Sequence, residues 1–477
     1  DFKKNIISFI LDYSVKTKNN INKFANDCEI AELFFYEENN YIQYRRAGKK
    51  LKNSKTFPEL KQIHCGFVGN ICNIDRYYTN LKCEEKYPFL KQNKTISLFN
   101  LDLHASVIED VIYNFKKINK NIHITQWSMS GHTWVFNKPK HNPKHVNQQT
   151  WTNFNLKTVD DFCNEYNNEL KKYDGFIVTH SPVFCLLYER YDKPIFLVNS
   201  CRYLIPYCWH RNDNMLGILN KKLKQMFDKK QLFIISNNLG DAEFLKLGTG
   251  IDSVYNPSLC LYTNIKYKPT TPKFLLLGNN NLITQNNNIV YKKDELKPRY
   301  KWDDLYKYKG LIIMPYEIST MSIFEYYSAD IPLIFPSKKF IRQLYKNHNL
   351  HLSSRYFKYR DFPKSLENPL GINYIDWWTE RADFYNDMKY ITYYDSIDQL
   401  YKLINTINTS NISFQMMLWN FNRQNRTNNV FTSFVNNYLK MESNYSSLEC
   451  KTLTNIPISI IIPTYPPHFN KLDNLIC

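Results

Sequence analysis

Short apolar runs alternate with stretches of helical periodicity from residue 95 onward. The first run, at 96–101, is followed by apolar side chains at 107, 108, 111, 112 and 115, a spacing that predicts a helix. Further predicted strands lie at 122–127, 175–179, 194–198 and 231–235, and helices are predicted over 159–173 and 216–227. Strands that alternate with helices are typical of βαβ units and a parallel sheet. The pattern therefore predicts one Rossmann-like domain over residues 95–265.

A second series of the same kind follows a polar linker at 266–273, which holds two prolines. Its predicted strands lie at 274–277, 289–291, 311–314 and 332–335, and helices are predicted over 302–307, 321–329 and from 338. Apolar positions between 413 and 440 again favour a helix, which would close the fold. The expected fold class is thus α/β, with two doubly wound Rossmann-like domains, 95–265 and 266–440, facing across a cleft.

The two ends of the chain follow other patterns. Residues 1–94 are expected to form a mixed α/β accessory segment, with an amphipathic helix pattern over 5–24. Residues 441–455 form a polar linker rich in Ser, Thr and Asn, and 456–465 have the pattern of a further strand. A strand without the rest of its domain predicts that 441–477 are a linker and the truncated start of another module.

Composition narrows the class of protein. The 16% of aromatic residues argues against disorder, and the net charge of +18 suits a partner that carries phosphates. The basic residues are dispersed, however, so no nucleic-acid-binding tail is predicted. The 11 cysteines follow no disulfide or zinc spacing, and no run reaches the roughly 20 apolar residues of a membrane helix. We expect a cytoplasmic protein with no integral membrane span.

Candidate chemistry concentrates in residues 310–336, which have the pattern strand, polar loop, helix, strand. Glu317 lies in the loop at a strand's carboxyl end, where ligands bind in open α/β sheets. Ser319 and Thr320 precede the helix, whose free N–H groups can bind a phosphate. Glu325 can accept hydrogen bonds from two ribose hydroxyls. Alternatively, Ser319 caps the helix and Glu325 is a solvated helix residue.

Polar side chains also follow the predicted strands of the first domain. Those expected at the acceptor side are Asp102, His104, Gly131, His132, His180 and Arg202. A histidine at the carboxyl end of a strand can orient an acceptor hydroxyl or stabilise a leaving phosphate. The loop at 128–134 places Gly131 between aromatic residues, which suits stacking on a sugar. For each histidine, a hydrogen-bonded structural role is the alternative.

Glu317 and Glu325 are eight positions apart, and Pro332 follows Glu325 by seven. This spacing resembles the E-x7-E donor-site motif of retaining GT-B glycosyltransferases, the glycogen synthase and family 4 group. Residues 294–315 are similar to that family's usual run into the motif. Residues 173–182 and 193–200 look like the paired strands that carry its acceptor-side histidines. The resemblance covers roughly residues 95–440.

The chain departs from the family pattern in three places. Asp330 stands where the family usually has Gly, and no glycine-rich loop follows the first strand at 96–101. The family's Arg and Lys that neutralise the donor diphosphate are also missing after the strand at 274–277. Lys292, Lys293 or Arg299 would have to replace them, or the helix end would hold the donor.

The resemblance implies a glycosyltransferase that moves a sugar from a nucleotide-sugar, UDP- or GDP-linked, to a glycan or other hydroxyl acceptor. It implies a retaining outcome and neither a metal nor a cofactor beyond the donor. The implied catalytic residues are Glu317, His180 and His132. The implied donor-binding residues are Tyr316, Ser319, Thr320, Ser322, Glu325, Lys292, Lys293 and Arg299.

Residues 456–465 resemble the opening strand of family 2 GT-A glycosyltransferases, so fusion to further transferase domains is expected. The expected partners are a nucleotide-sugar and a glycan or glycoconjugate, with no nucleic acid. Two alternatives remain open from the sequence. One is a nucleotide-sugar epimerase of GT-B fold, which needs no acceptor. The other is a degenerate module that binds glycan or nucleic acid without turnover.

Overall fold

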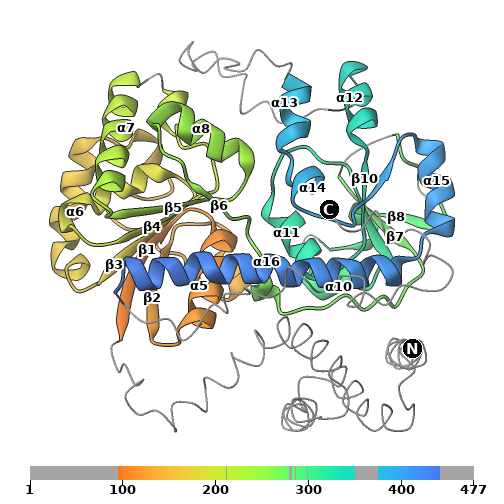
Figure 1. The fold of residues 1–477 in the computed structure, drawn as a ribbon, viewed down its shortest axis with the longest axis horizontal. Helices are drawn as coiled ribbons and strands as arrows, with labels where there is room; N and C mark the ends of the chain where they lie inside the picture. The colour runs from red at the N-terminus through yellow and green to blue at the C-terminus, as the bar shows by residue number, and fades with distance from the viewer. Residues whose placement is uncertain are drawn as a thin grey trace, which may run out of the picture. The chain divides into compact units, whose positions relative to one another are not determined.

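The computed structural model describes residues 95–440, without 211, 279–281, 285, 298, 349 and 351–373. The accessory segment predicted at 1–94 and the linker and further strand predicted at 441–477 lie outside the described residues. The named strands belong to two sheets, in which every strand pairing is parallel (Figure 1).

Six strands form the first sheet, in the order β2-β1-β3-β4-β5-β6. They are β1 (Ile96–Asp102), β2 (Ile122–Ser128), β3 (Gly175–Thr179), β4 (Ile195–Asn199), β5 (Leu232–Ser236) and β6 (Val254–Tyr255). The connecting helices are α5 (Ala105–Ile118), α6 (Leu156–Leu170), α7 (Asp213–Asp228) and α8 (Leu239–Thr249). After β2 the chain returns to the other side of β1, so the strand order reverses between β1 and β3. Doubly wound folds bind ligands at such a topological switch point.

Five strands form the second sheet, in the order β11-β10-β9-β7-β8. They are β7 (Phe274–Leu277), β8 (Ile289–Tyr291), β9 (Gly310–Ile313), β10 (Leu333–Pro336) and β11 (Thr392–Tyr394). The helices of this half are α9 (Lys292–Glu295), α10 (Trp302–Tyr306), α11 (Met321–Ser328), α12 (Lys338–Lys346), α13 (Tyr374–Arg381), α14 (Asp383–Asn386) and α15 (Ile397–Thr406). Here the switch point lies between β7 and β9.

The continuous apolar runs in the sequence are explained by burial on both faces. Every residue of β3, β4, β7, β9 and β10 is buried, as parallel strands covered by helices require. The two sheets confirm the predicted fold class of two Rossmann-like domains. The predicted strands 274–277 and 289–291 match β7 and β8. The short β6 and β11 were not predicted from the apolar pattern.

The last helix, α16 (Thr409–Asn437), connects the two domains. Figure 1 shows this 29-residue helix running past α11 and α5, and it contacts both. Asn420 donates a hydrogen bond to a backbone carbonyl of α11 over 2.8 Å. Further along, the rings of Phe431 and Phe434 lie 5.0 and 4.9 Å from that of Phe196 in the first sheet. One helix therefore contributes to the packing of both domains.

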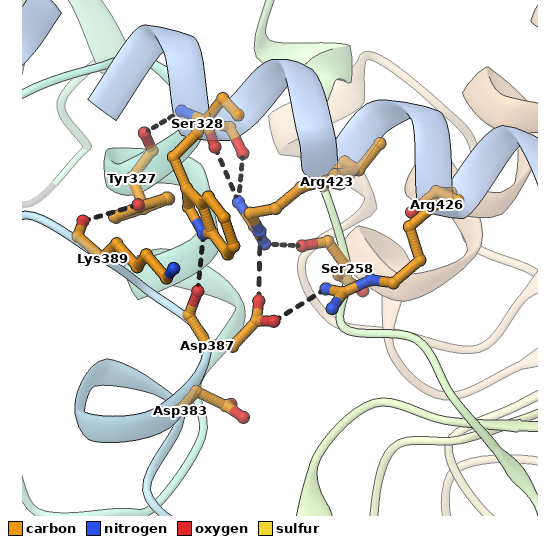
Figure 2. A network of polar contacts seen from close by, with 12 residues as sticks. Ser258, Tyr327, Ser328, Asp383, Asp387, Lys389, Arg423 and Arg426 are labelled. Atoms are coloured by element: carbon orange, nitrogen blue, oxygen red, sulfur yellow. Dashed lines mark hydrogen bonds and ion pairs between the residues drawn. The ribbon is translucent and has the colours of Figure 1, made fainter. Parts of the chain in front are cut away.

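Arg423 on α16 joins three segments through its guanidinium group (Figure 2). Its Nε donates to the Asp387 carboxylate over 3.2 Å, and its Nη1 donates to Ser328 Oγ over 3.3 Å. Its Nη2 donates over 2.8 Å to the carbonyl of Ser258, which lies in the segment between the two sheets. Asp387 also receives a bond of 2.8 Å from Arg426. This group, here called the Arg423 clamp, fixes the interdomain segment to the second domain.

Asp330, which follows α11, explains one departure from the resembled family. Its φ of 62° lies in the left-handed region that glycine favours. Asn420 donates to its carboxylate over 2.7 Å. Burial nevertheless raises the pKa of Asp330 to about 7. Aspartate is tolerated in this conformation, at the cost of a carboxyl that resists ionisation.

Replacing Asp330 with asparagine should stabilise the protein increasingly as the pH rises. With its pKa raised in the folded state, Asp330 contributes stability at about pH 4 that is lost as the pH rises through about 7. Asparagine tolerates the same backbone and cannot ionise, so the gain should reach about 1 to 3 kcal/mol at pH 8 and vanish near pH 4. Urea unfolding at several pH values measures the difference.

The matched control is Asp192→Asn, at an exposed carboxylate with a φ of 49°. This substitution should leave the pH dependence of unfolding unchanged. If Asp330→Asn raises the free energy of unfolding equally at pH 4 and pH 8, ionisation of Asp330 is not the cause of the destabilisation.

Candidate functional site

The switch point of the first sheet carries two histidines. His104 follows β1, and His180 directly follows β3. Their rings stack, with centroids 6.0 Å apart and planes inclined by 25°. Trp151 contacts His180 edge-on at 6.1 Å, and Trp209 contacts Trp151 at 5.5 Å. The structure therefore brings two predicted acceptor-side residues together and adds two tryptophans that were not predicted.

His180 has the features of a ligand-binding imidazole. Its φ of 73° is unusual for a residue other than glycine, and such conformations concentrate at functional sites. Its Nδ1 is buried and has no hydrogen-bond partner among residues 95–440 that the structure describes. Burial lowers the pKa of His180 to about 3, and His104 and Arg202 act in the same direction. A neutral ring with an unbonded nitrogen can pair with a ligand hydroxyl.

Asp102 is hydrogen-bonded to the end of β2, where the loop at 128–134 begins. Its carboxylate accepts hydrogen bonds from Ser128 over 3.0 Å and from Gln126 over 3.3 Å. Ser128 Oγ in turn accepts the N–H of Ser130, and Ser130 Oγ accepts the N–H of His132, over 3.4 and 3.1 Å. Burial raises the pKa of Asp102 to about 7. Asp102 is fully buried, and this chain of hydrogen bonds connects it to the loop that carries His132.

That loop is open to solvent and reaches the second domain. No atom lies within 4 Å of where a side chain at Gly131 would begin, and His132 is exposed. The loop leads into a short helix that carries Trp134, which is 44% exposed. The guanidinium of Arg299 lies 5.0 Å from the Trp134 ring. The predicted donor-side Arg299 thus contacts the predicted acceptor loop.

The switch point of the second sheet carries Glu317. Gly278 follows β7 with a φ of 103°, and a Cβ there would lie 3.1 Å from the carbonyl oxygen of Met314, after β9. Glycine suits this close approach of two strand ends. Beyond Met314, Tyr316 is 60% exposed, while Glu317 is buried and accepts the N–H of Ile318 over 3.1 Å. The segment 315–320, here called the donor loop after its predicted role, follows the carboxyl end of β9, as the sequence predicted.

The N-terminus of α11 has no side-chain cap. Thr320 is the N-cap residue, yet no side chain caps the helix, and its hydroxyl lies 3.3 Å from that of Ser322. The interpretation of Ser319 as the helix cap is therefore wrong. The N–H of Ile323 donates to the Thr320 carbonyl over 3.1 Å, and no side chain occupies the N-terminus of α11, where an anion can bind.

Glu325 is buried, so the interpretation of it as a solvated helix residue is also wrong. Its Oε1 accepts a hydrogen bond of 2.5 Å from the Tyr262 hydroxyl, and its Oε2 accepts one of 3.1 Å from the Trp302 indole. Burial raises the pKa of this carboxyl, and the two hydrogen bonds offset part of that rise. A ribose could reach Glu325 only by sharing or replacing these bonds.

Lys292 and Lys293 contact their own segment. The Lys292 ammonium donates to the Tyr300 hydroxyl over 2.8 Å and lies 4.3 Å from that ring. The Lys293 ammonium lies 5.2 Å from the ring of Tyr291. These contacts show where the two lysines lie without a ligand. They give no support to the idea that either one neutralises a diphosphate at α11.

The two switch points belong to domains that touch beside the donor loop. Asn237, after β5, lies 3.6 Å from the sulfur of Met321 at the start of α11. A Cβ at Gly240 would lie 2.6 Å from the Ile318 side chain, so α8 packs directly on the donor loop. Nearby, Arg381 donates to the carboxylate of Glu243 over 2.6 Å. The donor loop therefore lies against the carboxyl end of β5 in the first sheet.

Sequence reasoning missed Tyr262 and Trp302, which contact the predicted donor residue Glu325. Tyr262 bonds to Glu325 across 63 positions of sequence, and Trp302 bonds to it across 23. Trp302 does open a predicted helix, but no periodicity or spacing relates it to Glu325. These residues could be found only once the fold brought them together.

The described residues contain neither a metal-binding cluster nor a membrane-spanning helix. In the ranges that the structure covers, no group of three or more His, Cys, Asp or Glu side chains is placed to hold a metal ion. Among the helices described above, none has the length and apolar character needed to cross a membrane.

No protein-family model matches the chain, and no curated protein matches it in sequence. Similar solved structures include the calicheamicin glycosyltransferase CalG4, at 10% identity and a TM-score of 0.35, covering 72% of this chain and 99% of that one. The S. aureus MnaA complex with UDP is similar at 11% identity and a TM-score of 0.38, with coverage of 73% and 98%. A UDP-N-acetylglucosamine 2-epimerase is similar at 10% identity and a TM-score of 0.36, with coverage of 73% and 98%. At these values the likenesses assign no activity to this chain.

Proposed function

We propose that the chain is a glycosyltransferase that moves a sugar from a nucleotide-sugar to a hydroxyl group of a glycan acceptor. The observation that carries this proposal is the contact between the donor loop and the ligand edge of the first sheet. Through Ile318 against Gly240 and Met321 against Asn237, the donor loop lies against residues that follow β5, two strands along the sheet from β3 and His180. Substrates held at the carboxyl ends of the two sheets would therefore lie on the same side of this contact, as transfer between them requires.

The donor would bind the second domain. Its diphosphate would accept hydrogen bonds from the uncapped first turn of α11, with Thr320 and Ser322 beside it. Glu317 in the donor loop would hold hydroxyls of the transferred sugar, next to the exposed Tyr316. Glu325 would hold the ribose after the Tyr262 hydroxyl releases one carboxylate oxygen. The helix dipole would offset the charge of the leaving diphosphate, so this arrangement needs no bound metal.

The acceptor would bind the first domain, with its reacting hydroxyl against His180. The unbonded nitrogen of this neutral ring can accept the hydroxyl proton in a hydrogen bond. His104 stacks on His180 and would order it, while the exposed His132 and the open space beside Gly131 leave room for the rest of the acceptor. The E-x7-E spacing favours transfer with retention and a UDP- or GDP-linked donor.

A thermal-shift panel of UDP-, GDP-, ADP- and dTDP-sugars tests the proposal. One nucleotide class should raise the Tm of the wild type, because a ligand at about 100 times its Kd adds about 2.7 kcal/mol of stability. Glu325→Gln should abolish this shift relative to its own baseline Tm. The control is Glu295→Gln on α9, where an exposed carboxylate likewise accepts a hydrogen bond from a tyrosine, Tyr308, over 3.2 Å. This variant should keep the full shift.

If no nucleotide class raises the Tm of the folded wild type, the proposal is wrong. The rate of donor breakdown then distinguishes a transferase from an epimerase. A transferase should consume donor much faster when an acceptor glycan is present, whereas an epimerase should convert its nucleotide-sugar at the same rate without one.

A further inference from the structure

Two tryptophans from separate loops meet beside His180, at the carboxyl end of the first sheet. Trp151 opens a short helix (Trp151–Asn153), and Trp209 ends another (Tyr207–Trp209). The Trp151 ring contacts His180 edge-on, with centroids 6.1 Å apart and planes inclined by 87°. It contacts the Trp209 ring at 5.5 Å, with planes inclined by 68°. Trp151 therefore links the imidazole to Trp209, and the two indoles are here called the tryptophan corner.

Local packing anchors both loops of the corner to the chain that follows β3. Phe154, three residues after Trp151, is 1% exposed, and its ring packs against Phe184 with centroids 5.8 Å apart. Ser181 donates its hydroxyl to the Ile205 carbonyl over 2.7 Å, within the loop that leads to the second tryptophan. The two indoles are therefore held in place before any ligand binds, which lowers the entropic cost of binding.

Neither indole is fully buried by this packing. Trp209 is 36% exposed, and Trp151 is only partly buried. A single exposed aromatic ring is common on protein surfaces, but two adjoining rings beside an imidazole form an apolar surface that a ligand can cover. Tryptophan also offers a large flat face with few rotatable bonds to immobilise on binding.

Unsatisfied polar atoms lie at the strand ends next to the corner. The Nδ1 atom of His180 and the Oγ atom of Ser200 are buried, although both side chains are partly exposed. Neither atom has a hydrogen-bond partner among the described residues. Ser200 directly follows β4, which pairs with β3, so both atoms belong to neighbouring strand ends. Buried polar groups are generally hydrogen-bonded, so these two indicate a partner that the described chain does not supply.

We propose that the tryptophan corner binds a second sugar ring of the acceptor, so that the acceptor is a glycan of two or more sugars. The sugar with the reacting hydroxyl would lie at His180, and the next sugar would stack on Trp209, one aromatic ring further away. The inference rests on the proposed function, because that function places the reacting hydroxyl at His180.

The chemistry of the corner fits a sugar better than a flat aromatic alcohol. A sugar ring has a face of C–H groups, which can stack on an indole, and a rim of hydroxyls, which can pair with imidazole and hydroxyl groups. A flat aromatic acceptor could cover the indoles, but it would leave the polar atoms of His180 and Ser200 without partners. Such unpaired buried groups are costly, so they select against that class of acceptor.

Calorimetric titration of the full chain with neutral glycans, without nucleotide, tests this inference. The probes are maltotetraose, cellotetraose, mannotetraose and chitotetraose, each beside its monosaccharide, with the planar phenol 4-methylumbelliferone as the aromatic alternative. At least one tetrasaccharide should bind the wild type about tenfold or more tightly than its monosaccharide, because only the longer chain reaches both His180 and Trp209. Trp209→Leu should weaken that binding about tenfold, whereas Trp209→Phe keeps an aromatic face and should stay within about threefold of wild type.

Tyr113→Leu is the matched control, because Tyr113, in the middle of α5, has the same exposed fraction of 36%. It should leave glycan binding unchanged. The proposal is overturned if Trp209→Leu binds the tetrasaccharide as the wild type does, or if no tetrasaccharide binds more tightly than its monosaccharide. Binding of the planar phenol in place of every glycan would also overturn it. The comparison of glycan lengths uses the wild type alone, so it stands even if Trp209→Leu does not fold.

Failure of this inference and failure of the proposed function give different results. Trp209→Leu should keep the full Tm shift with the nucleotide-sugar, because Trp209 lies in the first domain. Glycan binding that depends on Trp209, in a chain that binds no nucleotide, would support the tryptophan corner and overturn the transferase. A nucleotide-sugar shift without any glycan binding would overturn the corner and leave a transferase with another acceptor.

Discussion

Replacing Arg423 with methionine is expected to lower the free energy of unfolding by about 3 to 5 kcal/mol, the usual cost of removing one partner of a buried ion pair. The Arg423 side chain is 1% exposed and bonds to Asp387, Ser328 and Ser258 at once. Methionine would leave the buried Asp387 carboxylate and three further acceptors, on Ser328, Asn420 and Ser258, without this donor. Guanidinium unfolding monitored by circular dichroism measures the loss.

Arg426→Met is the matched control, because Arg426 bonds to the same Asp387 carboxylate but is 35% exposed. Water can replace that contact, so the control should lose about 1 kcal/mol or less. Equal losses from the two variants would show that the Arg423 clamp adds no more than an ordinary surface pair. A loss confined to Arg423→Met would show that the interdomain segment depends on it (Figure 2).

Replacing His180 with asparagine should lower the turnover of the proposed transfer by about 10²- to 10⁴-fold, the range for a group that assists proton transfer. Asparagine tolerates the left-handed backbone that His180 adopts, so the fold should survive. Donor affinity should change by less than about threefold, because His180 lies at the other domain's switch point. Steady-state kinetics with the donor found in the panel gives both quantities.

The control for this substitution is His145→Asn. His145 also has a left-handed backbone, with a φ of 68°, but it is exposed and lies away from the strand ends. Its replacement should leave turnover unchanged. If the turnover of His180→Asn stays within about threefold of wild type, His180 is not a catalytic residue.

The sequence was informative wherever burial alone decides residue type. Strands β3 and β7 are covered on both faces, so their positions are apolar without interruption and could be predicted from hydrophobicity. The place of Glu317 followed from the same pattern, because a polar residue after such a strand lies at the ligand edge of a parallel sheet. The fold class and the donor loop were predictable for this reason.

The environment of each side chain depends on contacts distant in sequence, and there the predictions failed. Glu325 reads as a surface residue within its own helix, but Tyr262 and Trp302 cover it. Ser319 has the chemistry of a helix cap, but the helix begins one residue later, with Thr320 at the N-cap position. No local pattern encodes the partners of Glu325. The roles of the individual site residues therefore stay predictions, even though their positions are now known.

The path of α16 changes where the first domain ends as a unit of folding. Phe431 and Phe434 pack on Phe115 and Phe196, which belong to the first sheet and its first helix. A fragment of residues 95–265 would lack these two rings and expose the apolar surface that they cover. The missing rings follow the second domain in sequence, at the end of α16. The fragment should therefore be soluble only when the rest of the chain is produced with it.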